Sequence, residues 1–306
     1  MGGGTYSSLD RGTRATKLGY MTNTIAQTFK STSINNSMNP HGVTVRESRD
    51  SEEHPNSVAI ILALDVTGSM GSVPEHLVKT GLPHIMQSIL DSGIPDPQML
   101  FLAIGDHECD DAPLQVGQFE SSDELLDKWL TSVYLESGGG GNAGESYMLA
   151  WYFAAKHTNV DCFEKRKKKG FLFTIGDEPV LKSIPEHYLK GIMGPGQYEK
   201  DWTAVELLDK AREMYNVYHL HIKQTGSGRR QYVIDGWKQM MGDNLIVIQS
   251  ADHVSAEIAK IISDVEGTSE SQTDTETIDA PPDTELEDIP KKTPDNELED
   301  EPEEML

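Results

Sequence analysis

Long apolar runs, cysteines and an excess of basic side chains are all missing from this sequence of 306 residues. No apolar run approaches the roughly 20 residues that a membrane-spanning helix needs, and the first twenty residues contain no apolar signal core. The two cysteines, Cys109 and Cys162, are too few for a disulfide framework and suit a reducing compartment. We therefore expect a cytoplasmic protein, of an intracellular bacterial or phage type, that contacts no membrane.

The charge of the chain is strongly acidic and unevenly distributed. The net charge of −24 argues against binding nucleic acid through a basic surface. Residues 266–306 contain sixteen Asp and Glu and two Lys, a net charge of −14, which leaves −10 for the rest of the chain. This segment has no aromatic residues and few aliphatic ones, so it cannot bury enough surface to offset its ordering entropy. We expect residues 266–306 to form a disordered acidic tail.

The tail contains an approximate repeat. The sequence PDTELEDIP, Pro282–Pro290, recurs as PDNELEDEP, Pro294–Pro302. A duplicated acidic element with a central leucine could be a docking motif, and a solubilising tail with accidental repetition explains it equally well.

At the other end of the chain, residues 1–55 are polar and predict an arm that either packs on the main domain or stays mobile. A short helix in this arm is expected to place Leu18, Met21, Ile25 and Phe29 on one side.

Residues 56–265 alternate between strand-like and helix-like patterns. Apolar runs predict strands at Val58–Leu64, Met99–Gly105, Gly170–Gly176, Val217–Ile222 and Asn244–Gln249, with an edge strand at Leu114–Phe119. Helical patterns occur at Pro74–Leu90, Asp123–Tyr134, Glu145–His157, Thr203–Tyr215, Arg230–Met241 and Val254–Val265. Near-continuous apolar strands that alternate with helices predict a doubly wound α/β domain, whose mostly parallel sheet has helices on both faces.

Oxygen-bearing side chains follow several of these strands where each one ends. Asp65, Thr67 and Ser69 follow the first strand, Asp106 the second and Asp177 the third long one. The stretch ESGGGGNAGES precedes a helix and contains Asn142, Glu145 and Ser146. Because the carboxyl ends of parallel strands meet at one edge of a sheet, these groups should converge there. Carboxylate and hydroxyl oxygens suit a hard cation, Mg²⁺ before Ca²⁺, with Mn²⁺ as another alternative. A turn with a helix cap is the plainer explanation of Asp65, Thr67 and Ser69 taken alone.

The pattern Asp65-x-Thr67-x-Ser69 in this setting, with a glycine-rich second loop and the aspartate of TIGDEP, resembles the metal-ion-dependent adhesion site of von Willebrand factor type A domains. The resemblance covers about Ser57 to Val265. It implies the family's strand order, 3-2-1-4-5-6, and a divalent cation at the top of the sheet with an open position for a partner's Glu or Asp. Thr67 and Ser69 are then direct ligands, and Asp65 and Asp177 bind directly or through water.

The sequence departs from the family pattern at two positions. Thr67 stands where the family usually has serine, and the threonine of the family's second loop is missing from GGGGNAGES. Asn142, Glu145 or Ser146 must replace that threonine, and we favour Glu145. A further carboxylate would neutralise more of the cation's charge and weaken its demand for an acidic partner. Asp106 and Asn142 are expected to orient the metal ligands without binding the cation themselves.

Two functions are consistent with these residues. The first is a non-enzymatic module that binds a protein partner through the cation. The alternative is a Mg²⁺-dependent phosphatase or phosphotransferase with Asp65 as the nucleophile, but that chemistry needs a second Asp two residues later, where this chain has Thr67. We expect no enzymatic activity. An open cation would also attract the chain's own tail, through Glu285, Glu287, Glu297 and Glu299, so partial self-capture is a further hypothesis.

Overall fold

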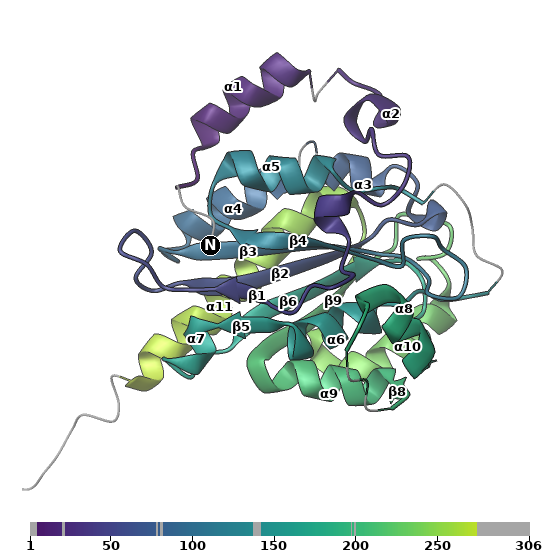
Figure 1. Ribbon diagram of the computed structural model, residues 1–306. Helices are drawn as coiled ribbons and strands as arrows, with labels where there is room; N and C mark the ends of the chain where they lie inside the picture. The colour runs from purple at the N-terminus through teal and green to yellow at the C-terminus, as the bar shows by residue number, and fades with distance from the viewer. Residues whose placement is uncertain are drawn as a thin grey trace, which may run out of the picture. The chain divides into compact units, whose positions relative to one another are not determined.

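The computed structural model describes residues 5–19, 22–77, 79, 82–136, 142–196, 198 and 200–273 (Figure 1). Residues 1–267 form one compact unit. The described strands are β1 (Arg46–Ser48), β2 (Val58–Asp65), β3 (Pro97–Ile104), β4 (Leu114–Glu120), β5 (Thr158–Val160), β6 (Gly170–Gly176), β7 (Ser183–Ile184), β8 (Trp202–Thr203), β9 (Tyr215–Ile222) and β10 (Leu245–Ile248). The described α-helices are α1 (Ser8–Leu18), α2 (Ile25–Thr28), α3 (Val73–His76), α4 (Leu82–Asp91), α5 (Asp123–Thr131), α6 (Met148–Lys156), α7 (Asp161–Glu164), α8 (Glu186–Met193), α9 (Ala204–Met214), α10 (Gln231–Met241) and α11 (Val254–Thr273).

The central sheet has six strands in the order β10-β9-β6-β2-β3-β4. All neighbouring pairs are parallel except β3 and β4, which are antiparallel. Counted along the chain, this order is 3-2-1-4-5-6, so the strand order implied by the resemblance is confirmed. The six predicted strands are all present, and β4 lies at an edge as expected.

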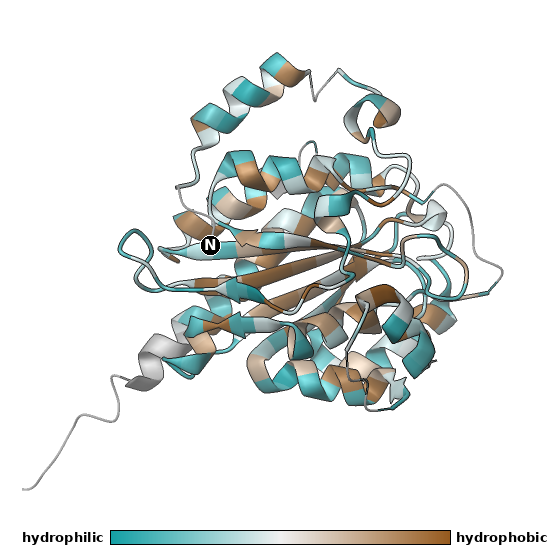
Figure 2. Cartoon of the chain, in the orientation of Figure 1, coloured by the Kyte–Doolittle hydropathy of each residue, from teal (hydrophilic) through white to brown (hydrophobic). Residues whose placement is uncertain are grey.

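Helices cover both faces of this sheet, which confirms the doubly wound α/β prediction. Alternate residues of β2 point to opposite sides: Ile60 and Leu62 pack with α4, α5 and α11, whereas Ala59 and Ile61 pack with α6, α9 and α10. Figure 2 shows apolar strands in the middle layer and polar outer faces on the helices. The long buried runs in the sequence therefore reflect a sheet that is apolar on both sides.

The N-terminal segment packs against the main domain. Figure 1 shows α1 lying over α5, where Arg11 Nε donates to Asp127 Oδ1 at 3.0 Å. Met38 is fully buried, and β1 pairs in parallel with β5. The expected helix around Leu18 to Phe29 is wrong in position, because Gly19 adopts a left-handed conformation (φ 68°) that ends α1.

Other helices also differ from their predicted bounds. Two α-helices, α3 and α4, replace the predicted helix Pro74–Leu90, and the proline at position 83 stands in the first turn of α4, where its missing N–H removes no helical hydrogen bond. Helix α11 continues to Thr273, so residues 266–273, which we assigned to the tail, are helical. Glu266 there forms an ion pair with Lys168 at 2.9 Å. The remaining tail, 274–306, lies outside the described residues.

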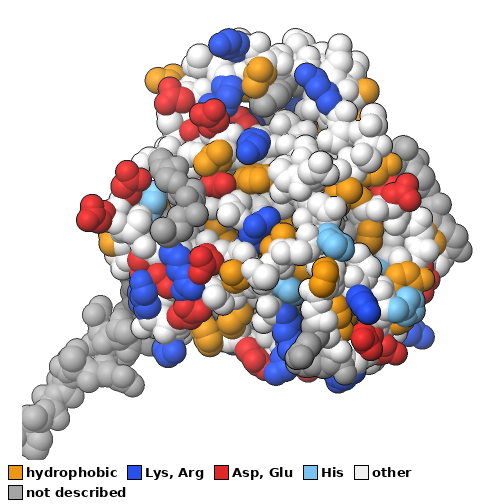
Figure 3. Space-filling view, viewed as in Figure 1, with side chains coloured by type: hydrophobic (Ala, Val, Ile, Leu, Met, Phe, Trp, Pro, Cys, Tyr) orange, Lys and Arg blue, Asp and Glu red, His pale blue; other side chains and the backbone are white. Residues whose placement is uncertain are grey.

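Ion pairs join the residues after β1 to α7 and to the residues that follow α7. Arg49 Nη1 lies 2.8 Å from Asp161 Oδ1, and Arg166 Nη1 lies 2.7 Å from Asp50 Oδ2. Figure 3 shows basic and acidic side chains side by side at this end of the molecule. Among the described residues, no helix is both long enough and apolar enough to cross a bilayer.

Candidate functional site

The carboxyl end of β2 forms a tight hydrogen-bonded turn. Asp65 is fully buried, and its Oδ1 accepts from the backbone N–H of Thr67 at 3.0 Å and from the Thr67 hydroxyl at 2.6 Å. The Thr67 and Ser69 hydroxyl oxygens are 3.2 Å apart. The alternation of Asp, Thr and Ser therefore places three oxygens side by side at the edge of the sheet.

The neighbouring strand β6 brings Asp177 to the same place. Ser69 Oγ donates to Asp177 Oδ1 at 2.7 Å, which links two segments that are 108 residues apart. Asp177 is fully buried. Its other oxygen, Oδ2, accepts from the Thr225 hydroxyl at 2.5 Å, and Thr225 belongs to the loop after β9. Loops that follow three parallel strands thus share one set of contacts.

Tyr147 reaches this site from the residue before α6. Its hydroxyl donates to Asp65 Oδ2 at 2.6 Å, and the side chain is fully buried. A Cβ at Gly176 would lie 1.9 Å from the Tyr147 hydroxyl, so the glycine before Asp177 leaves the space that this contact needs.

Glu145 is held beside the site through its backbone. Its N–H donates to Pro179 O at 2.8 Å, and its carbonyl accepts from Leu181 N at 3.0 Å, so it pairs with the segment that follows Asp177. The side chain is 8% exposed, and Oε2 is buried with no hydrogen-bond partner. The sequence predicted a helix that begins at Glu145. Because the backbone of Glu145 pairs with Pro179 and Leu181, α6 begins only at Met148.

The other predicted residues occupy different positions. Asp106 is buried with Oδ2 unpaired, while its Oδ1 accepts from Glu108 N at 2.9 Å. The Ser146 hydroxyl contacts His107, at 2.9 Å from its backbone nitrogen and 2.7 Å from Nδ1. Asn142 is exposed and donates to Glu108 Oε2 at 2.7 Å. Of the three candidates in the second loop, Glu145 is therefore the one whose side chain is both buried and short of a partner.

Burial and the charges of neighbouring acids raise the pKa values of Asp65 and Glu145. Burial, followed by the charge of Asp177, raises the pKa of Asp65 to about 7. Burial, followed by the charges of Asp65, Asp110 and Asp106, raises the pKa of Glu145 to about 10. A cation is the usual compensation for buried carboxylates of this kind.

The donor set fits a divalent cation if the hydroxyls are counted as ligands. Within the described residues, no three His, Cys, Asp or Glu side chains form a group that could hold a metal by themselves. The contacts between Asp65, Thr67, Ser69 and Asp177 supply two carboxylates and two hydroxyls, and Glu145 adds an unpaired buried oxygen. Oxygen-only sets of this kind suit Mg²⁺ or Ca²⁺.

Sequence reasoning missed two residues of the site. Tyr147 follows the glycine-rich loop directly, but nothing in the sequence distinguishes it from a packing residue of the next helix. Thr225 lies in the stretch TGSGRRQ, whose spacing does not match a phosphate-binding loop. The available signal was that Thr225 follows a parallel strand, since every loop at the carboxyl edge of the sheet can contribute residues to a binding site.

No family model matches the chain, and no curated protein is a significant match. Solved structures with a similar fold include the open conformation of the pilus adhesin SpaC from Lactobacillus rhamnosus GG, at 13% identity and a TM-score of 0.49 over 70% of this chain and 31% of that one. They also include a von Willebrand factor type A protein from Catenulispora acidiphila, at 8% identity and 0.40 over 68% and 42%, and the protein BatB from Bacteroides thetaiotaomicron, at 14% identity and 0.41 over 69% and 99%. This chain spans about a third of the adhesin's length. These likenesses concern the fold and carry no argument about activity.

Proposed function

We propose that this chain is a protein-interaction module that binds its partner through a divalent cation, with Mg²⁺ preferred over Ca²⁺ or Mn²⁺. The observation that carries the proposal is the continuous set of oxygen contacts from Asp65 through Thr67 and Ser69 to Asp177. A site of this kind brings together oxygens from separate strand ends, which a simple helix cap does not do.

Each residue of the site has a distinct part in the proposal. Thr67 and Ser69 offer neutral hydroxyl ligands, and Asp65 and Asp177 offer charge directly or through water. Glu145 offers a buried oxygen in place of the family's second-loop threonine. A divalent cation bound here would present a remaining position to a carboxylate of the partner protein.

The alternative of a phosphatase that uses Asp65 as its nucleophile has less support. Both oxygens of Asp65 accept short hydrogen bonds, from Thr67 at 2.6 Å and from Tyr147 at 2.6 Å, and these bonds reduce the reactivity of a carboxylate. The position two residues later holds a hydroxyl that donates to Asp65, where the mechanism needs an acid. A phosphatase assay in Mg²⁺, with Asp65→Asn as the control, tests this alternative.

The cation site is tested by thermal unfolding with Mg²⁺, Ca²⁺, Mn²⁺ or a chelator. At a metal concentration of 100 times Kd, binding adds about 2.7 kcal/mol to stability and raises Tm by about 6 °C. We expect the double variant Thr67→Ala, Ser69→Ala to lose this shift. Ser92→Ala is the matched control, because that hydroxyl bonds to Ser88 O within its own helix end. An unchanged shift in the double variant would contradict the site.

Partner binding is tested separately, by capture of proteins from a lysate on the immobilised full chain. We expect a specific partner to be retained in Mg²⁺ and released by chelator, and to be absent when Asp65→Asn is immobilised. Retention that is the same in chelator would show that binding does not use the cation.

A further inference from the structure

The proposed cation site is reached by solvent along two loops. Asp65 and Asp177 are fully buried, whereas Ser69 and Thr225 are half-buried and Gly68 is exposed. Ser69 follows β2 and Thr225 follows β9, and the hydroxyls of both contact Asp177. A partner that binds the cation therefore meets the loops after β2 and β9 as it approaches.

The loops on the two sides of the site carry opposite charge. Strands β2 and β6 lie at the centre of the sheet, with β3 on one side and β9 on the other. Residues 106–111, which follow β3, contain four acids and no Lys or Arg. Residues 223–230, which follow β9, contain three bases, Lys223, Arg229 and Arg230, and no acid. An acidic partner is therefore repelled on the β3 side and attracted on the β9 side.

Arg229 and Arg230 both present guanidinium groups at the surface. Arg229 is exposed, and its Nη1 donates to Gln224 O at 3.0 Å. The side chain of Arg230 is 49% exposed, and its Nη1 lies 3.5 Å from the Tyr232 hydroxyl and 3.9 Å from Glu178 Oε2. Within the described part of the chain, these contacts of the two side chains involve Nη1 alone. The other N–H groups of each guanidinium can therefore donate to a carboxylate.

Glu178 keeps Arg230 near the site without occupying its hydrogen bonds. The 3.9 Å between Arg230 Nη1 and Glu178 Oε2 is longer than a hydrogen bond, and Oε2 is buried with no hydrogen-bond partner. Glu178 directly follows Asp177, and its carbonyl accepts from Trp237 Nε1 at 2.9 Å. The guanidinium is therefore held beside the strand end that carries Asp177, with donors left for a further acid.

Tyr232 adds exposed apolar surface next to these charges. Its side chain is 58% exposed, and it lies in the first turn of α10, after Arg230. Tyrosine and arginine are the residue types that most often contribute binding energy at protein interfaces. An exposed tyrosine beside two arginines favours a protein segment over a small inorganic anion.

We propose that the partner presents a short acidic segment that crosses the site from β2 toward α10. One carboxylate of this segment binds the cation, a second pairs with Arg229 and Arg230, and an apolar side chain between them packs on Tyr232. This inference rests on the proposed function, because it concerns the same partner at the same site. It adds the requirement for a second acid and the direction in which the segment lies.

Two labelled peptides test the requirement for a second acid. The first is Gly-Glu-Glu-Leu-Glu-Glu-Gly, and the second, Gly-Gly-Gly-Leu-Glu-Gly-Gly, has a single acid. Fluorescence anisotropy with the full chain at about 150 mM salt limits long-range charge effects to about 8 Å. In Mg²⁺ we expect the first peptide to bind about tenfold more tightly than the second, and chelator should release both. Equal affinity for the two peptides would overturn the proposal.

Variants of the basic loop connect this preference to the arginines. The double variant Arg229→Gln, Arg230→Gln should weaken the first peptide by about tenfold and change the second by no more than about twofold. Tyr232→Gln should weaken the first peptide by about threefold. None of these changes should reduce the rise in Tm that Mg²⁺ causes, since none removes a proposed ligand of the cation.

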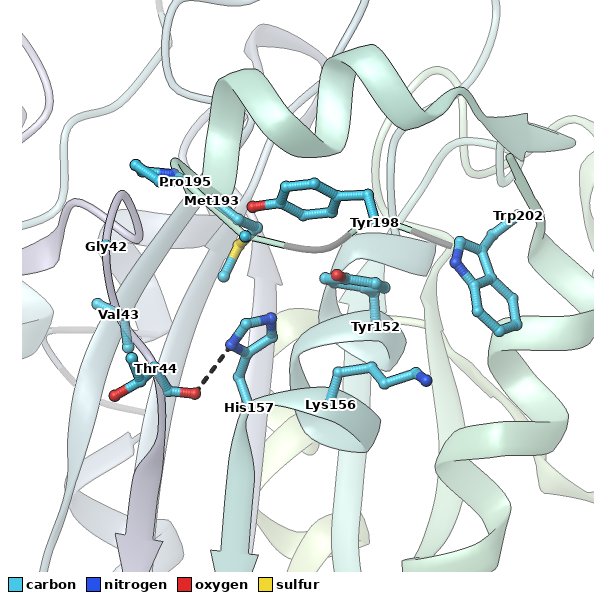
Figure 4. A pocket seen from close by; sticks show the side chains of 11 residues that line it. Gly42, Val43, Thr44, Tyr152, Lys156, His157, Met193, Pro195, Tyr198 and Trp202 are labelled. Carbon is cyan, nitrogen blue, oxygen red and sulfur yellow. Dashed lines mark hydrogen bonds between the residues drawn. The ribbon is translucent and has the colours of Figure 1, made fainter. Parts of the chain in front are cut away.

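The control is a double variant with the same change of charge, Lys156→Gln, Lys190→Gln, at two exposed positions. Figure 4 shows Lys156 beside a pocket of about 310 Å³ at the end of α6 away from Tyr147, so the control also tests binding of the peptide there. We expect it to leave the affinity within about twofold. An equal loss in the two double variants would reveal a general effect of charge and overturn the proposal.

The remaining outcomes separate this inference from the proposed function. Mg²⁺-dependent binding of the first peptide that is unchanged in the arginine variant would overturn the inference and leave the proposed function standing. No Mg²⁺-dependent binding by the unmodified chain would overturn both. Binding that needs the arginines and persists in chelator would show that they take an acid without the cation, which also overturns the joint use of the two.

Discussion

The hydroxyl of Tyr147 donates to Oδ2 of Asp65 across 2.6 Å, between residues that are 82 positions apart. Thr67 binds the other oxygen of the same carboxylate, so Asp65 is held from two sides in a fully buried position. The two contacts orient the carboxylate toward the hydroxyls that follow it. Groups that hydrogen-bond to a metal ligand and orient it typically contribute 10- to 100-fold to metal affinity.

Replacing Tyr147 should therefore affect both the stability of the chain and Mg²⁺ binding at the proposed cation site. We expect Tyr147→Phe to lower the free energy of unfolding by about 1 kcal/mol and to weaken Mg²⁺ binding by about tenfold. Tyr215→Phe is the matched control, since that buried hydroxyl contacts Thr158 at 2.6 Å. Chemical unfolding and Mg²⁺ titration separate the two effects. Equal loss of Mg²⁺ affinity in both variants would mean that Tyr147 acts through general stability.

Thr225 should change the Mg²⁺ affinity of the proposed cation site through its contact with Asp177. Thr225→Val removes the hydroxyl that donates to Asp177 Oδ2 at 2.5 Å, and we expect Mg²⁺ affinity to fall by about tenfold. Thr225→Ser keeps the hydroxyl and should restore most of the affinity. The same hydroxyl accepts from Gly228 N at 3.0 Å, so both variants are also compared in chelator for their effect on the loop. If the valine and serine variants bind Mg²⁺ equally well, the hydroxyl has no part in the site.

Glu145→Gln should have opposite effects with and without metal. The substitution removes a buried carboxylate whose Oε2 has no hydrogen-bond partner, so the chain should gain about 1 kcal/mol of stability in chelator. The stabilisation by Mg²⁺ should shrink, because a charged ligand has become neutral. Glu213→Gln, an exposed change, is the control. A Mg²⁺ shift equal to that of the unmodified chain would remove Glu145 from the ligand set.

The ion pairs around Asp161 predict a pH dependence of stability. Burial opposes the charge of Asp161, but hydrogen bonds from Lys165, the Asp50 backbone and Arg49 outweigh it and lower its pKa to about 2. An acid with a lowered pKa stabilises the folded state above its unfolded pKa of about 3.8, and this contribution is lost as the pH falls toward 2. Asp161→Asn should therefore cost about 1 to 2 kcal/mol at pH 7 and almost nothing near pH 2. Urea unfolding at pH 7 and near pH 2 measures the loss of stability in Asp161→Asn. An equal loss at both pH values would contradict the lowered pKa of Asp161.

The self-capture hypothesis rests on the acidic repeats of the tail and is tested by truncation. Removing residues 268–306 should raise the affinity for an acidic peptide in Mg²⁺ and have no effect in chelator, because a competing carboxylate source is lost. A tail whose acids are all changed to amides is the control for length. Unchanged Mg²⁺-dependent affinity after truncation would leave the tail as a solubilising or separately docking segment.

Much of the fold could be predicted because the apolar patterns along the sequence match the strands and helix faces that are buried in the structure. Strands β2, β3 and β6 come from nearly continuous apolar runs, and such runs have few alternatives to a sheet covered on both faces. Short elements such as β1, β5, β7 and β8 could not be predicted, since two or three residues carry no periodicity. The end of α1 depended on the left-handed conformation of Gly19, and the extension of α11 to Thr273 includes an ion pair between Glu266 and Lys168.

The sequence by itself determined the sheet, its strand order through the resemblance, and the convergence of Asp65, Thr67, Ser69 and Asp177, because parallel strands bring their carboxyl ends to one edge. The tertiary structure decided which further side chains reach that edge. Tyr147 reaches Asp65 because Gly176 leaves space for its ring, and Thr225 reaches Asp177 from a loop 48 residues away. It also decided that Glu145, and neither Asn142 nor Ser146, has a buried oxygen free of hydrogen bonds. Such contacts depend on distances between separate elements, and no local pattern along the chain encodes them.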